Sequence, residues 1–172
     1  MRKLQAQHPQ LRRNRPDSVF AAATMNFGPQ VVTREHTDGG NKANGICPIW
    51  CAGSFDYRSG GHLILRQLGK VLQFPPGSMV LIPSATLLHG NTAIGADETR
   101  ISFTQYTAGG LFRWVGNGFQ TERYIKENNA DFYKEIQAAK PIRRQRAIDA
   151  FSYLDNLHAD RLSAGLLRSC SV

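Results

Sequence analysis

Short apolar runs separated by turn-forming residues fill the middle of the chain, from about residue 30 to residue 109. Runs of this length, bounded by Gly, Pro, Asn and Ser, are typical of β-strands. The candidate strands are QVVTREH (30–36), GGHLILRQL (60–68), GKVLQFP (69–75), SMVLIPS (78–84), ATLLHGNTAI (85–94) and ETRISFTQYTAG (98–109). Tight turns are expected at Leu68-Gly69 and in the Pro-Pro-Gly-Ser sequence at 75–78. No long helix interrupts the series, so the pattern predicts a mainly β fold, as a sandwich, jelly roll or barrel, rather than a parallel α/β fold.

The segments around this series are less regular. Residues 1–18 are basic and lack apolar periodicity, which predicts a flexible arm or a short helix at the edge of the fold. The sequence SVFAAATMNFG (18–28) fits either the beginning of a strand or a short helix. Residues 39–60 also show little periodicity and predict a long loop. Such a loop would form the rim or lid of any site at Asp38.

Beyond Gly118 the apolar spacing becomes helical. Thr121 can cap a helix with Glu122 in its first turn, and Pro141 suits the first turn of a second helix. The expected buried positions are Ile125, Phe132 and Ile136 in the first helix and Ile148, Phe151 and Leu154 in the second. The division expected is a basic arm (1–18), a β core (19–118) and a helical buttress on the sheet (119–172).

Composition narrows the class of protein. The chain has 172 residues, of which 41% are hydrophobic and 20% charged, as expected for one globular domain. No apolar run approaches the length of a membrane span, and the N-terminus lacks the apolar core of a secretory signal. The three cysteines favour free thiols or packing residues, with Cys47 and Cys51 less suited to zinc because no second pair accompanies them. An intracellular location, in the nucleus or cytoplasm, is therefore expected.

Charge adds a possible partner. The net charge is +8, with basic clusters at LRRNRP (11–16) and KPIRRQR (140–146). This balance permits binding to DNA, RNA or another polyanion, although basic ends are also common as plain solvated surface.

Polar residues at the ends of predicted strands indicate a possible chemistry. His36 and Asp38 are two apart, so in an extended segment their side chains share a face, as do Arg100 and Ser102. Two histidines and one carboxylate form the facial triad of non-haem iron oxygenases, with His89 as the second histidine. The three open positions take a bidentate 2-oxo acid and dioxygen. Arg suits a distal carboxylate of that acid, and a nearby serine hydroxyl adds a hydrogen bond.

Each of these residues also has an ordinary explanation. His-x-Asp-Gly can be a plain strand end with a turn, and a lone histidine such as His89 is more often a hydrogen-bonded core residue. Arg100 alone would commonly be part of a surface ion pair. Their occurrence together, in this order on predicted strands, is much less expected by chance.

The sequence also resembles a known family. HTDGG (36–40), GGHLIL (60–65), FPPGSMVLIPSATLLHGNT (74–92) and ETRISFTQYTAGGLFRW (98–114) are similar to the double-stranded β-helix domain of iron- and 2-oxoglutarate-dependent dioxygenases. The resemblance covers about residues 24–119 and is nearest to the fungal, transposon-associated branch related to the TET/JBP base hydroxylases. It implies iron ligation by His36, Asp38 and His89 and binding of the 2-oxoglutarate carboxylate by Arg100 with Ser102.

The resemblance carries further expectations. The fold would be a double-stranded β-helix (jelly roll) with C-terminal helices packed on its outside. The activity would be hydroxylation or oxidative demethylation of a substrate C–H bond, on a modified base of DNA or RNA. Trp50, Tyr57 and Arg58 are candidates for gripping that base, and Asn91 for the cavity wall beside the co-substrate. The alternatives are a small-molecule hydroxylase and a catalytically silent module that binds nucleic acid. Only 35 residues precede His36, which leaves open how much of a substrate site the chain builds.

Overall fold

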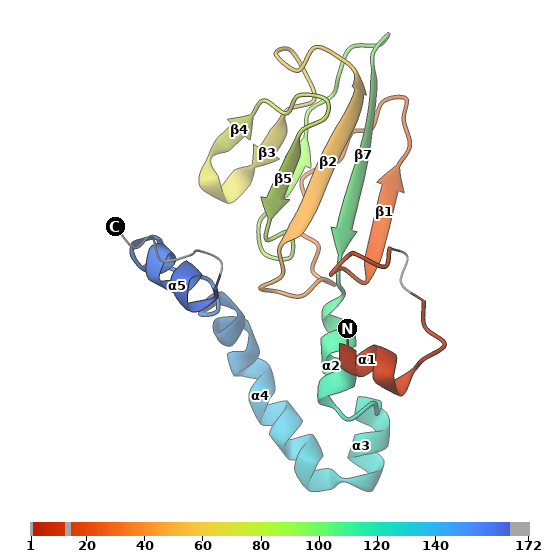
Figure 1. Ribbon diagram of the computed structural model, residues 1–172, viewed down its shortest axis with the longest axis vertical. Helices are drawn as coiled ribbons and strands as arrows, with labels where there is room; N and C mark the ends of the chain where they lie inside the picture. Colours follow the sequence, from red (N-terminus) through yellow and green to blue (C-terminus); the bar gives the residue numbers. More distant parts are fainter. Residues whose placement is uncertain (1, 13–14, 166–172) are drawn as a thin grey trace.

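Two antiparallel sheets form the body of the protein, and the helices belong to the N-terminal and C-terminal parts of the sequence (Figure 1). The computed structural model describes residues 2–12 and 15–165. The larger sheet has the order β1-β7-β2-β5, formed by Ala22–Asn26, Thr99–Tyr106, Cys47–Ser54 and Met79–Ile82. The smaller sheet has the order β4-β3-β6, formed by Lys70–Leu72, Leu63–Leu65 and His89–Asn91. The fold is therefore mainly antiparallel β with added helices.

Several predicted strands and turns are confirmed. β3 and β4 pair as a hairpin through the short 3-10 helix η1 (Arg66–Leu68), followed by Gly69. Gly69 has φ 57°, a left-handed conformation that glycine adopts without steric cost. The Pro-Pro-Gly-Ser turn closes with the Ser78 N–H donating to the Pro75 carbonyl. The segment at 18–28, for which strand and helix were both open, contains strand β1.

The expectation of a long loop over 39–60 is wrong. Its second half contains β2, an eight-residue strand that pairs with β5 on one side and β7 on the other. Cys47, Ile49 and Cys51 alternate with Pro48, Trp50 and Ala52 along β2, and both sets are apolar. A strand that is apolar on both faces shows no period-two pattern, so its sequence could not be distinguished from a loop.

Residues 30–36 are the opposite case, because the predicted strand is not formed. Only isolated bridges occur there, from Gln30 to Arg100 and from His36 to His89. The segment crosses the body as an extended linker that touches both sheets. It carries the first histidine of the predicted triad.

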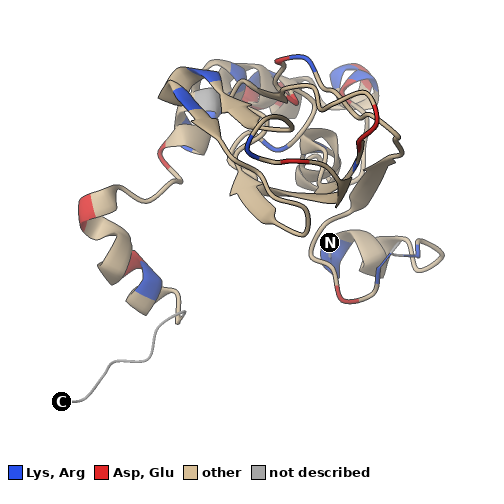
Figure 2. Cartoon of the chain, turned by 90° about the horizontal axis from the view of Figure 1, so that it is seen from above, with Lys and Arg blue, Asp and Glu red and all other residues tan. Residues whose placement is uncertain are grey.

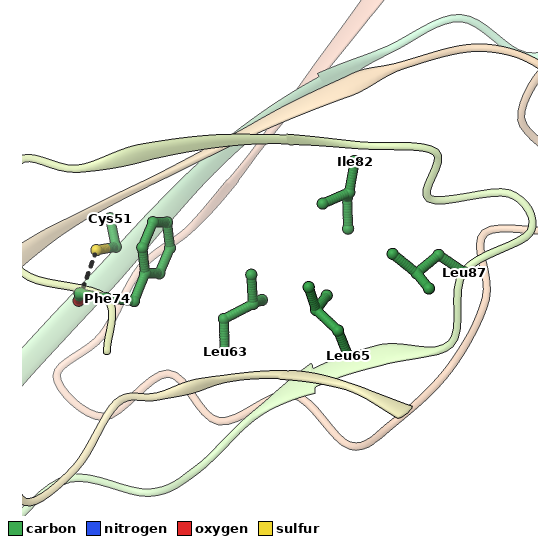
Figure 3. Packing of buried hydrophobic residues seen from close by; sticks show 6 residues of the cluster. All are labelled: Cys51, Leu63, Leu65, Phe74, Ile82 and Leu87. Atoms are coloured by element: carbon green, nitrogen blue, oxygen red, sulfur yellow. Dashed lines mark hydrogen bonds between the residues drawn. The ribbon is translucent and has the colours of Figure 1, made fainter. Parts of the chain in front are cut away.

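The core lies between the two sheets (Figure 3). Its buried residues are Cys51, Leu63, Leu65, Phe74, Ile82 and Leu87. Burial of each large aliphatic or aromatic side chain contributes about 1.5–3 kcal/mol. Cys47 and Cys51 are both buried and free, as expected of packing thiols, and Cys170 lies outside the described residues.

Helices at the two ends depart from the expectations in several ways. The N-terminal α1 (Arg2–Gln7) buries Leu4, which fits the predicted short edge helix. α2 (Gly109–Gly116) follows β7 directly and was not predicted. α3 (Glu122–Asn128) begins as predicted, with the Thr121 hydroxyl accepting a hydrogen bond from the Tyr124 N–H.

The second predicted C-terminal helix begins earlier than expected. α4 (Ala130–Ile148) is capped by Asn129, whose side chain accepts a hydrogen bond from the Phe132 N–H, and Pro141 lies inside the helix. Ile148 and Leu154 are 44% and 84% exposed, so the predicted buried face of that helix is wrong. The 3-10 helix η2 (Leu154–Asn156) and α5 (Leu157–Ser163) follow, and residues 166–172 of the predicted helical segment lie outside the described residues.

The C-terminal helices do not form the predicted layer on the sheet. α3 and α4 contact each other, α4 rises from α3 beside the body, and α5 projects beyond its end as a separate element (Figures 1 and 2). The single helix predicted to carry Ile125, Phe132 and Ile136 is wrong, because the helix breaks at Asn129, which divides these residues between α3 and α4. Ile125 and Ile136 are nevertheless buried and Phe132 is half-buried. Helical periodicity thus identified buried positions, but neither the helix break nor the surface against which the helices pack. Within the described residues, no helix is both long and apolar enough to cross a membrane.

Candidate metal centre and anion-binding cavity

His36 and His89 are brought together by backbone pairing. The His36 N–H donates to the His89 carbonyl (2.9 Å) and the His89 N–H donates to the His36 carbonyl (3.0 Å). Residues that exchange both bonds lie directly opposite each other, with their side chains on the same face. The two imidazole centroids are consequently 4.6 Å apart.

The extended segment before His36 is fastened to β6 by side chains as well. The Asn91 carboxamide oxygen accepts from the Thr33 N–H (2.9 Å), and its nitrogen donates to the carbonyls of Val31 (3.1 Å) and Thr92 (2.8 Å). Gly90 lies against the same segment, where an added Cβ would stand 2.8 Å from the Thr33 carbonyl oxygen. Asn91 lines the cavity, but its amide atoms are engaged with the backbone. A contact between Asn91 and a co-substrate stays a prediction.

Each imidazole can offer the lone pair of its Nε2 atom to a metal ion. His36 Nδ1 lies 2.9 Å from the Arg34 carbonyl oxygen, and His89 Nδ1 lies 2.8 Å from the Leu87 carbonyl oxygen. A carbonyl oxygen can only accept, so each Nδ1 carries the proton. In the neutral ring this leaves a lone pair on Nε2, the arrangement typical of histidines that bind a metal.

Asp38 completes the group. Its Oδ1 lies 3.3 Å from His36 Nε2, while its Oδ2 accepts from Asn41 Nδ2 at 3.3 Å. Asn41 Nδ2 is also 3.3 Å from the Ser84 hydroxyl, and the Asp38 N–H donates to the Ser84 carbonyl at 2.8 Å. The donor atoms of His36, Asp38 and His89 all lie within 4.8 Å of one another, so these three residues can hold one metal ion.

Asn41 and Ser84 were not identified from the sequence. Asn41 follows the Asp-Gly-Gly turn, and the Asn41 N–H donates to the Asp38 carbonyl at 2.8 Å. Asn is common in turns, so turn chemistry was the only signal for Asn41. Nothing in the local sequence of Ser84 indicated that it would lie beside Asp38.

The three candidate ligands open into a cavity of about 470 Å³. Its walls come from the inward-facing side chains of β1 and β7, from β6 and from the 38–41 turn. Arg100 and Ser102 of β7 line the same cavity, so the five residues singled out as ligands and carboxylate clamp share one space. Their roles in binding stay predictions.

Arg100 is a buried cation with incomplete partners. It is 2% exposed, its NH1 donates to the Val31 carbonyl (3.2 Å), and its Nε has no hydrogen-bond partner. No carboxylate of the described residues forms an ion pair with it. Burial lowers the pKa of Arg100 from its ordinary value, an effect that the nearby Cys51 partly opposes. Ser102 is 8% exposed and accepts from Asn26 Nδ2, which leaves its hydroxyl proton available.

The candidates for gripping a base do not line this cavity. Trp50 alternates with Ile49 and Cys51 along β2, and Ile49 faces the cavity, so Trp50 points to the outer face of the sheet. The Arg58 guanidinium carbon lies 5.4 Å from the centre of the Tyr57 ring, in a cation–π contact on the surface. None of these three side chains therefore faces the candidate metal centre.

Comparison with known proteins leaves the family open. No family model matches the chain, and no curated protein matches its sequence. Among solved structures, the chain is similar to the viral collagen prolyl hydroxylase of Paramecium bursaria Chlorella virus-1 in complex with 2OG, with a TM-score of 0.34 and 12% identity. The match covers 61% of this chain and 66% of the viral chain, just under two thirds of its length. Because this likeness is weak, the donor geometry is the evidence for function.

Proposed function

We propose that the chain is an iron(II)- and 2-oxoglutarate-dependent oxygenase whose two sheets form a double-stranded β-helix. One observation carries the proposal: two histidines and a carboxylate converge in the same cavity as a buried arginine that lacks an acidic partner. A metal site alone would also suit a zinc hydrolase, but a hydrolase gives no reason for the buried arginine.

The residues present fit both proposed groups. His36 and His89 offer Nε2 and Asp38 offers Oδ1, which is the donor set that iron(II) takes in facial-triad sites. A buried and unpaired cation is costly, so the Arg100 guanidinium favours an anion in the cavity. A 2-oxo acid with a distal carboxylate fits both features, because its 2-oxo acid end can bind the metal and its distal carboxylate can bind the Arg100 guanidinium.

The residues would divide the work as follows. Arg100 would hold the distal carboxylate of 2-oxoglutarate through its guanidinium, and the Ser102 hydroxyl would donate a hydrogen bond to the same carboxylate. His36, Asp38 and His89 hold the metal at the other end. When bound, iron and 2-oxoglutarate supply the activation of dioxygen that hydroxylates a substrate C–H bond and releases succinate and carbon dioxide. If that carbon is attached to nitrogen, the hydroxylated product decomposes and the result is demethylation.

For the substrate we propose a modified base in DNA or RNA, within the TET/JBP-like branch. The support is the net charge of +8 and the sequence resemblance. A base within a duplex would be flipped out of the stack to enter the cavity. Binding to DNA and RNA at several salt concentrations checks the partner, because phosphate contacts make affinity fall steeply with salt. A shallow salt dependence on both polymers would favour a small-molecule substrate.

Succinate formation tests the activity. The protein is loaded with iron(II) without oxygen, given 2-oxoglutarate and then exposed to oxygen. We expect succinate from the native chain and none above background from the His36→Ala variant. A Val71→Ala variant, altered on the exposed strand β4, is the matched control and should retain activity. If native protein and His36→Ala give the same background, the oxygenase proposal fails and a silent binding module becomes the better explanation.

A further inference from the structure

The outer face of the four-stranded sheet is apolar. Met25, Phe103, Trp50 and Met79 lie side by side in one row across β1, β7, β2 and β5. Their neighbours along each strand point inward to the cavity or core. None of the other outward positions is charged, and three of them are polar; they are Ala23, Pro48, Ala52, Ser54, Leu81, Thr99, Ile101 and Gln105.

This face is also open to solvent. Met25 is 48% exposed, Met79 is 63% exposed and Leu81 is 59% exposed, and Trp50 and Phe103 between them are half-buried. An antiparallel sheet with one solvated face normally alternates apolar and polar residues, and this sheet does not. Contiguous exposed apolar surface of this kind marks an interaction site.

A second unpartnered apolar surface lies near the C-terminus. Residues 149–165, which we call the arm, contain η2 and α5. Tyr153 is 71% exposed and Leu154 is 84% exposed, and Leu157 and Leu162 are each more than one third exposed. The arm projects from the body as a separate element (Figure 2). Within the described residues, these apolar side chains of the arm therefore remain largely uncovered.

Charge distinguishes the arm from the rest of the protein. The arm carries Asp149, Asp155 and Asp160 against a single basic residue, Arg161, in a chain of net charge +8. The segment that leads from α1 into the start of β1 is basic in sequence, with Arg12 and Arg15 against Asp17, and it reaches one end of the sheet (Figure 1). An acidic arm is thus complementary in charge to the segment at that end of the sheet, while the apolar face itself is uncharged.

The arm of the same chain does not cover this face. The apolar residues of both surfaces are exposed, and α5 projects beyond the end of the 19-residue α4 as an element separate from the strands (Figure 2). A second copy of the chain offers both surfaces at equal concentration. In a two-fold arrangement each copy would use its arm and its sheet once, which closes the assembly.

We propose that two copies of the chain associate, with the arm of each lying on the outer face of the other's four-stranded sheet. The sheet face used is opposite to the cavity, so the inference is independent of the proposed activity. The apolar helix-on-sheet packing that the sequence predicts within one chain would then be formed between two chains.

Molar mass in solution tests the association. Light scattering of the full chain over a range of concentrations should give about twice the 19.1 kDa of one chain at the upper end. Met79→Lys on the sheet face and Leu154→Asp on the arm should each halve that mass, because a charge would be buried against an apolar surface. Val71→Lys, on exposed β4 of the other sheet, is the matched control and should leave the mass doubled. Circular dichroism confirms that each variant is folded, and succinate formation should be unchanged in all three.

A mixing experiment tests which surfaces meet. The Met79→Lys copy keeps an intact arm and the Leu154→Asp copy keeps an intact sheet face, so one of the two contacts can form between them. The mixture should therefore show a higher mass than either variant alone. A native chain that is monomeric at every concentration would overturn the proposal. A dimer that survives Leu154→Asp, or a mixture that stays monomeric where native protein is dimeric, would overturn the pairing of arm with sheet.

Discussion

Arg100 combines two properties that rarely occur together in one side chain. It is almost fully buried, and its Nε atom has no partner. A buried polar atom without a hydrogen bond costs about 1–3 kcal/mol, so the folded protein gives up stability at this position. Such a cost is common where a side chain is held ready for a ligand.

Replacing Arg100 should therefore separate ligand binding from stability. Arg100→Met keeps the apolar bulk and removes the charge, so we expect the free energy of unfolding without ligands to stay equal or rise. The same variant should bind 2-oxoglutarate about 10–100-fold more weakly, as expected for the loss of a charge-assisted hydrogen bond worth about 1.5–3 kcal/mol. Calorimetric titration of the metal-loaded protein measures the affinity, and urea unfolding measures the stability.

A comparison of co-substrates sharpens this prediction. 2-Oxobutyrate has the metal-binding end of 2-oxoglutarate but no distal carboxylate. Its affinity should be nearly the same for the native chain and for Arg100→Met. If the variant loses affinity for both acids equally, Arg100 does not contact the distal carboxylate.

The chemistry-bearing residues could be predicted, but the residues that orient them could not. His36 and Asp38 share a face because of the two-residue period of an extended chain, which the sequence alone contains. Asn41 and Ser84 act on Asp38 only because a turn and the end of β5 meet in space. Contacts of that kind depend on tertiary structure, and no spacing along the chain encodes them.

At the scale of elements, the metal centre depends on a segment that is not itself a strand of either sheet. Residues 31–36 are held by Asn91, by the paired backbones of His36 and His89, and by a bidentate ion pair between Glu35 and Arg66. The Arg66 guanidinium lowers the pKa of Glu35 through the hydrogen bond and its charge. That attachment is therefore present above the ordinary pKa of a glutamate and is lost as the pH falls through the lowered pKa of Glu35.

Gly90 sets how closely this segment can approach β6. An alanine Cβ at this position would stand 2.8 Å from the Thr33 carbonyl oxygen, which is backbone and cannot rotate away. Gly90→Ala should push the segment outward, lower the melting temperature and weaken metal binding at least tenfold. Titration with manganese(II), followed by electron paramagnetic resonance, measures the affinity.

Gly116→Ala in α2 is the matched control for this substitution. An added Cβ there meets nothing within 4 Å, and alanine favours a helix over glycine by about 1 kcal/mol. Its metal affinity should equal that of the native chain and its melting temperature should stay level or rise. Equal metal affinities of the two variants would show that the position of the 31–36 segment does not control the site.

Two of the errors made from the sequence, at β2 and at the C-terminal helices, concern apolar residues whose partners the pattern does not reveal. β2 is apolar on both faces because one face meets the core and the other belongs to the exposed apolar surface. The C-terminal helices show an apolar stripe, but periodicity cannot say which surface the stripe will cover. Under the proposed association both failures have one origin, because the outer face of the sheet and the apolar residues of the arm would find their partners on a second copy.

For the whole molecule, the proposed ligands would join the two sheets. His89 belongs to the smaller sheet, Arg100 belongs to the larger one, and the segment with His36 and Asp38 crosses between them. Ligands that bind the folded chain but not the unfolded chain stabilise the fold, by an amount that grows with the ligand concentration and with the affinity. When metal and 2-oxoglutarate share contacts, each should also raise the affinity for the other.

Thermal unfolding should reveal this coupling. Manganese(II) alone should raise the melting temperature, 2-oxoglutarate alone should raise it little, and both together should raise it by more than the sum of the separate shifts. His36→Ala should abolish the shift with manganese, and chelation of the metal should return the native chain to its starting value. In Arg100→Met the metal shift should remain while the extra shift with 2-oxoglutarate disappears, because the distal carboxylate has no partner. Strictly additive shifts in the native chain would mean that the metal centre and the arginine serve two separate ligands, and the oxygenase proposal would lose its physical basis.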